Sequence, residues 1–160
     1  MKKILVLVSA LAVMAFCNVV GAANDFAAVK SMLDTAERIV PANAEIVSTE
    51  EGAETTLLVY VDEETMTYYD LSFNTATLKL EKMRAQSSNI IGSTMMSKTV
   101  GDIEKIVLQE YPEAADLEIT TVKDGLNTCY KAAFDTAAYR AVLKLNPVTG
   151  AIGERVLFYK

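Results

Sequence analysis

Two segments of the chain carry apolar residues at the spacing of an α-helix. Asn24 or Asp25 is a candidate N-cap for the first segment, Thr99 and Asp102 form a candidate capping box for the second, and a proline follows each segment. The apolar positions are Phe26, Val29, Leu33, Ala36 and Val40 in the first segment and Val100, Ile103, Val107 and Tyr111 in the second. A repeat of about 3.6 residues predicts one buried stripe on each helix.

Four strand-like segments follow each predicted helix. They are rich in β-branched and aromatic residues, and turn-forming stretches separate them, such as Asp124-Gly125 and the segment "NPVTG", whose Pro147 and Gly150 predict the turn between the last two strands. We expect strands at 45–49, 55–61, 66–73, 78–83, 117–122, 128–134, 138–145 and 152–159. Alternation along the second and third strands predicts one shared face made by Leu57, Val59, Val61, Tyr69, Leu71 and Phe73.

The second half of the chain repeats the first. The matching pairs lie 71 to 73 residues apart and are Val40-Pro41 with Tyr111-Pro112, Glu51-Gly52 with Asp124-Gly125, and Phe73-Asn74 with Leu145-Asn146. The repeat predicts an α+β fold of two tandem units, each with one helix packed on an antiparallel meander sheet of three to four strands. We place the units at 24–86 and 98–160, joined by a linker at 87–97 that is rich in Ser, Gly and Met.

The second unit resembles the PepSY domain. The resemblance lies in a helix that ends in Tyr-Pro ("IEKIVLQEYPEA"), a strand and hairpin ("LEITTVKDG", "CYKAAF") and a segment that closes on Asn-Pro-x-Thr-Gly ("AVLKLNPVTGAI"). The first unit looks like a diverged copy, with "FNTATLKL" in place of the last motif, and the tandem layout resembles the β-lactamase-inhibitor-like fold. Asn146 stands where Asp is frequent in the family. The resemblance implies an exported module that binds and restrains peptidases, with no catalytic residues to carry over.

The N-terminus has the pattern of a signal peptide. Lys2 and Lys3 precede a mostly apolar run at 4–20, which small residues follow at 21–23. We expect residues 1–23 to be removed, leaving a periplasmic or secreted protein with no stable membrane insertion. The alternative is an uncleaved anchor, although the run is barely long enough to span a bilayer and contains Ser9 and Asn18.

The charge balance excludes some classes of partner and chemistry. The chain has 15 Lys plus Arg against 21 Asp plus Glu, a formal charge of −6, and loss of the two leader lysines lowers it to −8. We therefore expect no nucleic-acid partner. The chain has no histidine, and only Cys129 remains of its two cysteines after cleavage. We accordingly expect no enzyme, no cofactor and no metal site.

Two further features have alternative interpretations. The acidic run Asp62-Glu63-Glu64 is either a calcium site or a solvated turn, and its place in a tight hairpin favours the turn. Cys129 lies beside Lys131 on a predicted strand, so it is either a reactive or dimer-forming thiol or a small half-buried apolar residue. Free cysteine usually takes the second role, which we favour.

The outer faces of the sheets are the candidate protein-binding surface. Tyr, Met and Arg are enriched at such surfaces, although the linker or the other unit would also account for apolar side chains there. The candidate residues are Leu58, Tyr60, Met66, Tyr68, Asp70, Lys131, Arg140 and Lys144. The sequence predicts a non-catalytic protein that modulates or inhibits an extracytoplasmic peptidase or other envelope enzyme. The alternatives are a carrier or sensor for a small ligand held between helix and sheet or between the units, and a redox-responsive protein that uses Cys129.

Overall fold

The computed structural model of the protein describes residues 22–87 and 91–160. The predicted signal peptide lies outside this part of the chain, apart from Ala22 and Ala23, at which the first helix begins. In chain order the elements are α2 (Ala22–Ala36), β1 (Glu45–Glu51), β2 (Thr55–Asp62), β3 (Thr67–Asn74), β4 (Leu80–Ser87), α3 (Val100–Glu110), β5 (Ala115–Asp124), β6 (Asn127–Asp135), β7 (Tyr139–Leu145) and β8 (Ile152–Tyr159). Neither helix is long and apolar enough to cross a membrane.

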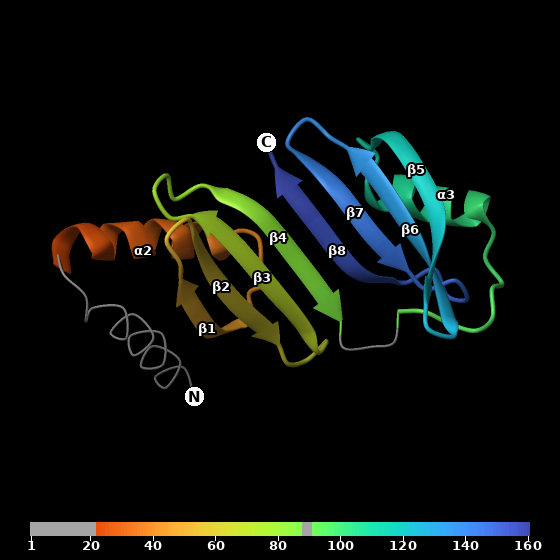
Figure 1. The fold of residues 1–160 in the computed structure, drawn as a ribbon, viewed down its shortest axis with the longest axis horizontal. Helices are drawn as coiled ribbons and strands as arrows, with labels where there is room; N and C mark the ends of the chain where they lie inside the picture. Colours follow the sequence, from red (N-terminus) through yellow and green to blue (C-terminus); the bar gives the residue numbers. More distant parts are fainter. Residues whose placement is uncertain (1–21, 88–90) are drawn as a thin grey trace.

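All eight strands form one continuous antiparallel sheet in the order β1-β2-β3-β4-β8-β7-β6-β5 (Figure 1). The prediction of two units, each with its own sheet, is therefore wrong. The last strand of the first half, β4, pairs directly with the last strand of the second half, β8, and Met83 lies opposite Leu157. This pairing satisfies backbone N–H and C=O groups that two separate sheets would leave at exposed edges. Alternation within a strand carries no information about such a partner.

Both helices cover the same face of the sheet (Figure 1). Met32 and Ala36 of α2 and Ile103 and Val107 of α3 are buried in one core. The largest fully buried sheet residues in that core are Leu58, Leu71, Phe73, Phe134, Leu143 and Leu145. The opposite face carries neither helix and is called the open face below.

The predicted start of the second helix is confirmed. The Thr99 side chain accepts a hydrogen bond from the Asp102 backbone N–H, and the Asp102 side chain accepts one from the Thr99 N–H. Val100 nevertheless stays 50% exposed at the start of the helix. The first helix begins at Ala22, so Asn24 lies inside it rather than at its N-cap. Phe26, assigned to the buried stripe, is 54% exposed.

The "NPVTG" segment is a structural turn between β7 and β8. The Asn146 Oδ1 accepts hydrogen bonds from the N–H groups of Val148 and Thr149. Gly150 has a φ of 80°, a region that side chains disfavour. A Cβ atom at Gly150 would lie 2.4 Å from Cδ1 at the tip of the Ile106 side chain, so an alanine there would also displace this side chain of α3. The turn that connects β7 to β8 therefore packs against α3.

The same turn also anchors the segment that leads into α3. The Pro147 carbonyl accepts hydrogen bonds from the backbone N–H groups of Ser97 and Lys98, at 3.1 and 2.9 Å. Upstream, the N–H and C=O groups of Ser93 pair with those of Thr128 on β6. The described end of the predicted linker, from residue 91, is thus hydrogen-bonded to the second half.

The turn between β3 and β4 has the same hydrogen-bond pattern without the Pro and Gly. The Asn74 Oδ1 accepts from the N–H groups of Ala76 and Thr77, and the Leu78 N–H donates to the Asn74 carbonyl at 2.8 Å. Leu78 adopts a φ of 57°, the conformation that Gly150 takes in the second half. An asparagine that caps its own turn is therefore the feature that both copies share.

The predicted orientation of β2 is wrong by one residue. Leu58 pairs with Leu71, and Tyr60 pairs with Tyr69, so these side chains lie on the covered face. Leu57, Val59 and Val61 lie on the open face instead. The sequence of this strand is "TTLLVYVD", which is apolar at successive positions, so the alternation alone does not determine which set is buried.

Candidate functional site

The open face is built from alternate residues of the sheet, and the seven strands from β2 to β5 in sheet order form the part described below. Its members, assigned from the strand register, are Leu57, Val59, Val61, Tyr68, Asp70, Ser72, Lys82, Arg84, Gln86, Glu118, Thr120, Lys131, Ala133, Asp135, Arg140, Val142, Lys144, Glu154, Val156 and Phe158. Side chains two residues apart in a strand point to the same side, which places all of them on the surface that the helices leave uncovered.

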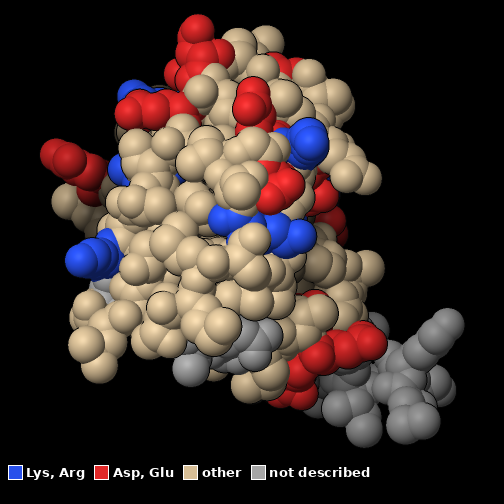
Figure 2. Space-filling model, turned by 90° about the vertical axis from the view of Figure 1, so that its right-hand side faces the viewer, with Lys and Arg blue, Asp and Glu red and all other residues tan. Residues whose placement is uncertain are grey.

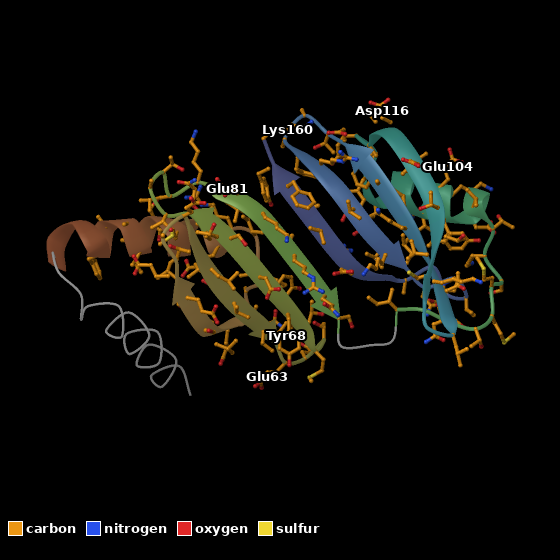
Figure 3. The ribbon with its side chains drawn as sticks, in the orientation of Figure 1. Glu63, Tyr68, Glu81, Glu104, Asp116 and Lys160 are labelled. Atoms are coloured by element: carbon orange, nitrogen blue, oxygen red, sulfur yellow. The ribbon has the colours of Figure 1, made fainter. Side chains whose placement is uncertain are left out.

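The structure places most of the predicted binding residues on the open face. Tyr68 is 44% exposed at the start of β3, beside the β2–β3 turn that carries Glu63 (Figure 3). Asp70, Lys131, Arg140 and Lys144 also lie on this face. These residues extend from β3 to β6 across the sheet and do not form one compact site.

Three predicted residues lie elsewhere. Leu58 and Tyr60 are 1% and 5% exposed on the covered face, so their assignment to the outer face is wrong. Burial, with a contribution from the Glu37 charge, raises the pKa of Tyr60 to about 12. Met66 lies in the turn between β2 and β3 with a φ of 51° and is 49% exposed.

An ionic network crosses the centre of the open face, where the halves of the chain meet. Arg84 Nε on β4 lies 2.7 Å from Glu154 Oε1 on β8, and Lys144 Nζ on β7 lies 2.6 Å from Glu154 Oε2. Asp70 on β3 lies 3.7 Å from Arg84, and the Arg84 guanidinium also donates a hydrogen bond to the Gln86 side chain. The network spans four strands and both halves.

Glu154 is the buried member of this network. Its side chain is 7% exposed, whereas those of Arg84 and Lys144 are 39% and 43% exposed. Burial alone would raise the pKa of Glu154, but the hydrogen bonds and charges of Lys144 and Arg84 outweigh it, and the net effect lowers the pKa. Glu154 is therefore an ionised carboxylate that links both halves of the sheet.

A hollow of about 380 Å³ lies on the second half of the open face. It is lined by Glu118, Thr120, Lys131, Ala133, Arg140, Val142 and Phe158, which come from β5, β6, β7 and β8. Ala133 and Val142 lie opposite each other and form a short floor, and the longer side chains of Lys131, Arg140 and Phe158 stand around it. The hollow exists because small residues on the inner strands are surrounded by large ones.

The two cations of the hollow have no ionic partner within residues 22–87 and 91–160. Lys131 lies opposite Lys144, whose charge is neutralised by Glu154. Arg140 lies opposite Asp135, which instead pairs with Lys160 at 3.0 Å. Both cations are exposed and able to bind an external acceptor.

Several members of this surface were not among the predicted residues. Glu154 and Phe158 both belong to β8, and the alternation of "IGERVLFY" would have placed them on one face with Val156. The hollow itself has no comparable signal in the sequence, because it depends on side-chain sizes in four strands that are brought together only by the fold.

The acidic turn and the cysteine have structural environments. Asp62 is 3% exposed and accepts hydrogen bonds from Asn43, the Glu64 N–H and the Thr65 N–H and hydroxyl, so it is not a solvated residue. The Thr65 hydroxyl is the main cause of its lowered pKa. Cys129 is 5% exposed. Among the described residues no cluster of three or more Cys, Asp or Glu side chains is arranged to hold a metal ion.

No family model, curated protein or solved structure shows a significant match to the chain. The open face is therefore interpreted from its own geometry.

Proposed function

We propose that the protein is an exported, non-catalytic binding protein whose open face holds a partner protein, an extracytoplasmic peptidase or another envelope enzyme. The observation that carries the proposal is the one-sided sheet. Two helices bury one face, while the other displays Tyr68 and Phe158, which are 44% and 43% exposed, among charged side chains of both signs. Exposed aromatic residues on a rigid surface, with charges around them, are typical of protein interfaces.

The size and rigidity of the surface support a protein partner. The open face spans seven hydrogen-bonded strands, so its side chains hold fixed relative positions without the cost of ordering loops. The strand register places acidic and basic side chains next to one another on the open face, and the end of the molecule at which α3 and β5 lie also carries both signs among uncharged side chains (Figure 2). Such a mixture gives specificity through complementary charges rather than through bulk attraction.

A small ligand between helix and sheet is less favoured. That side is filled by residues less than 2% exposed, among them Phe73, Phe134, Leu71 and Ile103. The absence of histidine from the sequence and the burial of Cys129 likewise favour binding over catalysis. The resemblance of the second half to the PepSY domain agrees with a peptidase as the partner.

The proposal is tested by measuring peptidase activity in the native envelope fraction with and without the purified protein. We expect the protein to lower that activity and the double variant Val59→Asp with Tyr68→Ala to lose the effect, because both positions lie on the open face of the first half. The matched control is Leu108→Ala, which removes an apolar side chain, 40% exposed, from α3 on the covered side. Circular dichroism verifies that all three proteins fold. Equal inhibition by the double variant would rule out this surface.

A further inference from the structure

We infer that the hollow between Lys131 and Arg140 binds the C-terminal residue of a polypeptide, taking an apolar side chain on its floor and the terminal carboxylate on Arg140. The inference rests on the proposed function, because it specifies the chemistry that the open face recognises in a partner. Four strands contribute to the hollow, and the regular strand pairing fixes their relative positions.

The charges of the hollow select a monoanion. Lys131 and Arg140 contribute two positive charges and Glu118 one negative charge, which leaves an excess of one positive charge in a chain whose formal charge is −6. Within the described residues neither cation has an ion pair of its own. The guanidinium of Arg140 offers two parallel N–H donors, which match the two oxygens of a carboxylate.

The floor and rim select an apolar body beside that carboxylate. Ala133 and Val142 present only methyl groups, and the ring of Phe158 stands at the rim, 43% exposed. The Lys82 Nζ lies 5.7 Å from the centre of this ring and covers one of its faces. A side chain of aromatic or branched aliphatic type would therefore bury its surface on the floor and against the free part of the ring.

The shape favours a chain end over a chain that passes through. Lys131 precedes Ala133 by two residues on β6, and Arg140 precedes Val142 by two residues on the antiparallel β7, so the two cations stand at opposite ends of the floor. A polypeptide that continued along the strand direction would have to pass over Arg140 or Lys131. A volume of about 380 Å³ is at the lower end of the range for small-molecule sites, which suits one terminal residue.

The test uses the folded protein with methyl-labelled Ala and Val, observed by NMR. The probe is N-acetyl-glycyl-phenylalanine with a free carboxylate, and the matched probe is its C-terminal amide. We expect saturable shifts of the Ala133 and Val142 methyl signals with the acid, at a dissociation constant of about 1–10 mM, and binding of the amide weaker by about tenfold. Equal binding of both probes, or no shift of these signals at about 20 mM, would overturn the inference.

Two variants and a third probe complete the test. Arg140→Gln is expected to weaken binding of the acid by about tenfold, whereas Lys79→Gln, the same charge change on an exposed turn of the first half, leaves it unchanged. The third probe, N-acetyl-phenylalanyl-glutamate amide, carries its carboxylate on a side chain. Tighter binding of this probe would assign the hollow to an internal acidic residue and refute the chain end.

The outcomes for the hollow and for the proposed function are distinguishable. The inhibition experiment changes Val59 and Tyr68 in the first half, outside the hollow. Loss of inhibition in that variant would support the open face as a protein-binding surface. If the acid probe did not bind in the same series, the chain-end site alone would be refuted.

Discussion

Arg84 on β4 lies directly opposite Val156 on β8, and the two residues occupy equivalent positions in the two halves of the chain. The bounds of β4 and β8 are 72 residues apart at both ends, which is also the separation of the capping residues Asn74 and Asn146. The halves are therefore related by an approximate two-fold axis normal to the sheet at this pair. The edge strand of each half completes the other, which explains why the repeat forms one sheet.

Identical halves would place like side chains on both sides of that axis, but this chain differs at the positions that meet. Lys82 corresponds to Glu154 in the repeat, and Gln86 corresponds to Phe158. As a result, Arg84 on β4 contacts the carboxylate of Glu154 on β8, where two identical halves would place a second lysine. The ion pair between Arg84 and Glu154 thus favours the pairing of unlike halves over self-pairing of either one.

We predict that Glu154→Gln lowers the free energy of unfolding by about 1–2 kcal/mol. This loss is small for a buried ion pair, because the partners Arg84 and Lys144 stay in contact with water. The measurement is urea unfolding, with Glu50→Gln on an exposed edge position as the control. Because folding lowers the pKa of Glu154, its contribution is present above the ordinary value of 4.5 and is lost as the pH falls through the folded pKa. The difference between wild type and variant should accordingly shrink at acidic pH, and a constant difference would contradict this role.

The sequence predicts the positions of strands, turns and helix caps well, because these depend on residues that are close together in the chain. All eight predicted strands overlap observed strands, and the capping box at Thr99 is confirmed. The Asn146 turn was also identified, because proline and glycine are informative punctuation. The pairing of β4 with β8 was missed, since alternation specifies which face a residue takes and not which strand lies beside it.

The candidate site was predicted less well, for a related physical reason. Leu58 and Tyr60 were assigned to the wrong face because β2 is apolar on both sides, and one-residue errors in a strand exchange its faces completely. Lys131 and Arg140 were identified by charge. Their common hollow was not, because it requires Ala133 and Val142 from neighbouring strands to meet as a floor.

The turn glycines provide a second prediction. Gly150→Ala should lower the free energy of unfolding by about 2–3 kcal/mol, because it adds left-handed strain and displaces the tip of the Ile106 side chain. Gly125→Ala is the matched control. It also has positive φ, at 60°, but a Cβ there meets no atom within 4 Å, so it should cost only about 1 kcal/mol. Equal losses in thermal unfolding would show that packing against α3 plays no part.

The assignment of the faces of β2 is tested by two identical substitutions at adjacent positions. Leu58→Ala should cost about 2–5 kcal/mol, because Leu58 is 1% exposed in the core beneath α2. Leu57→Ala removes the same atoms from the partly exposed open face and should cost less than about 1 kcal/mol. Chemical denaturation of both variants gives the comparison, and a larger loss at Leu57 would restore the opposite face assignment.

The buried tyrosine on the same strand predicts how stability changes at alkaline pH. Burial and the charge of Glu37 raise the pKa of Tyr60 from 10.0 to about 12, so the folded state holds this proton more tightly than the unfolded chain. Stability is therefore complete below pH 10 and falls as the pH rises from 10 towards 12, by about 1.4 kcal/mol per unit from this group. Tyr60→Phe should reduce that fall in melting temperature without removing it, because the pKa of Tyr139 is also raised to about 12. Glu37→Gln should reduce the alkaline fall in melting temperature by a smaller amount, since burial is the larger cause of the raised pKa of Tyr60. An unchanged slope in Tyr60→Phe would show that this side chain does not govern alkaline unfolding.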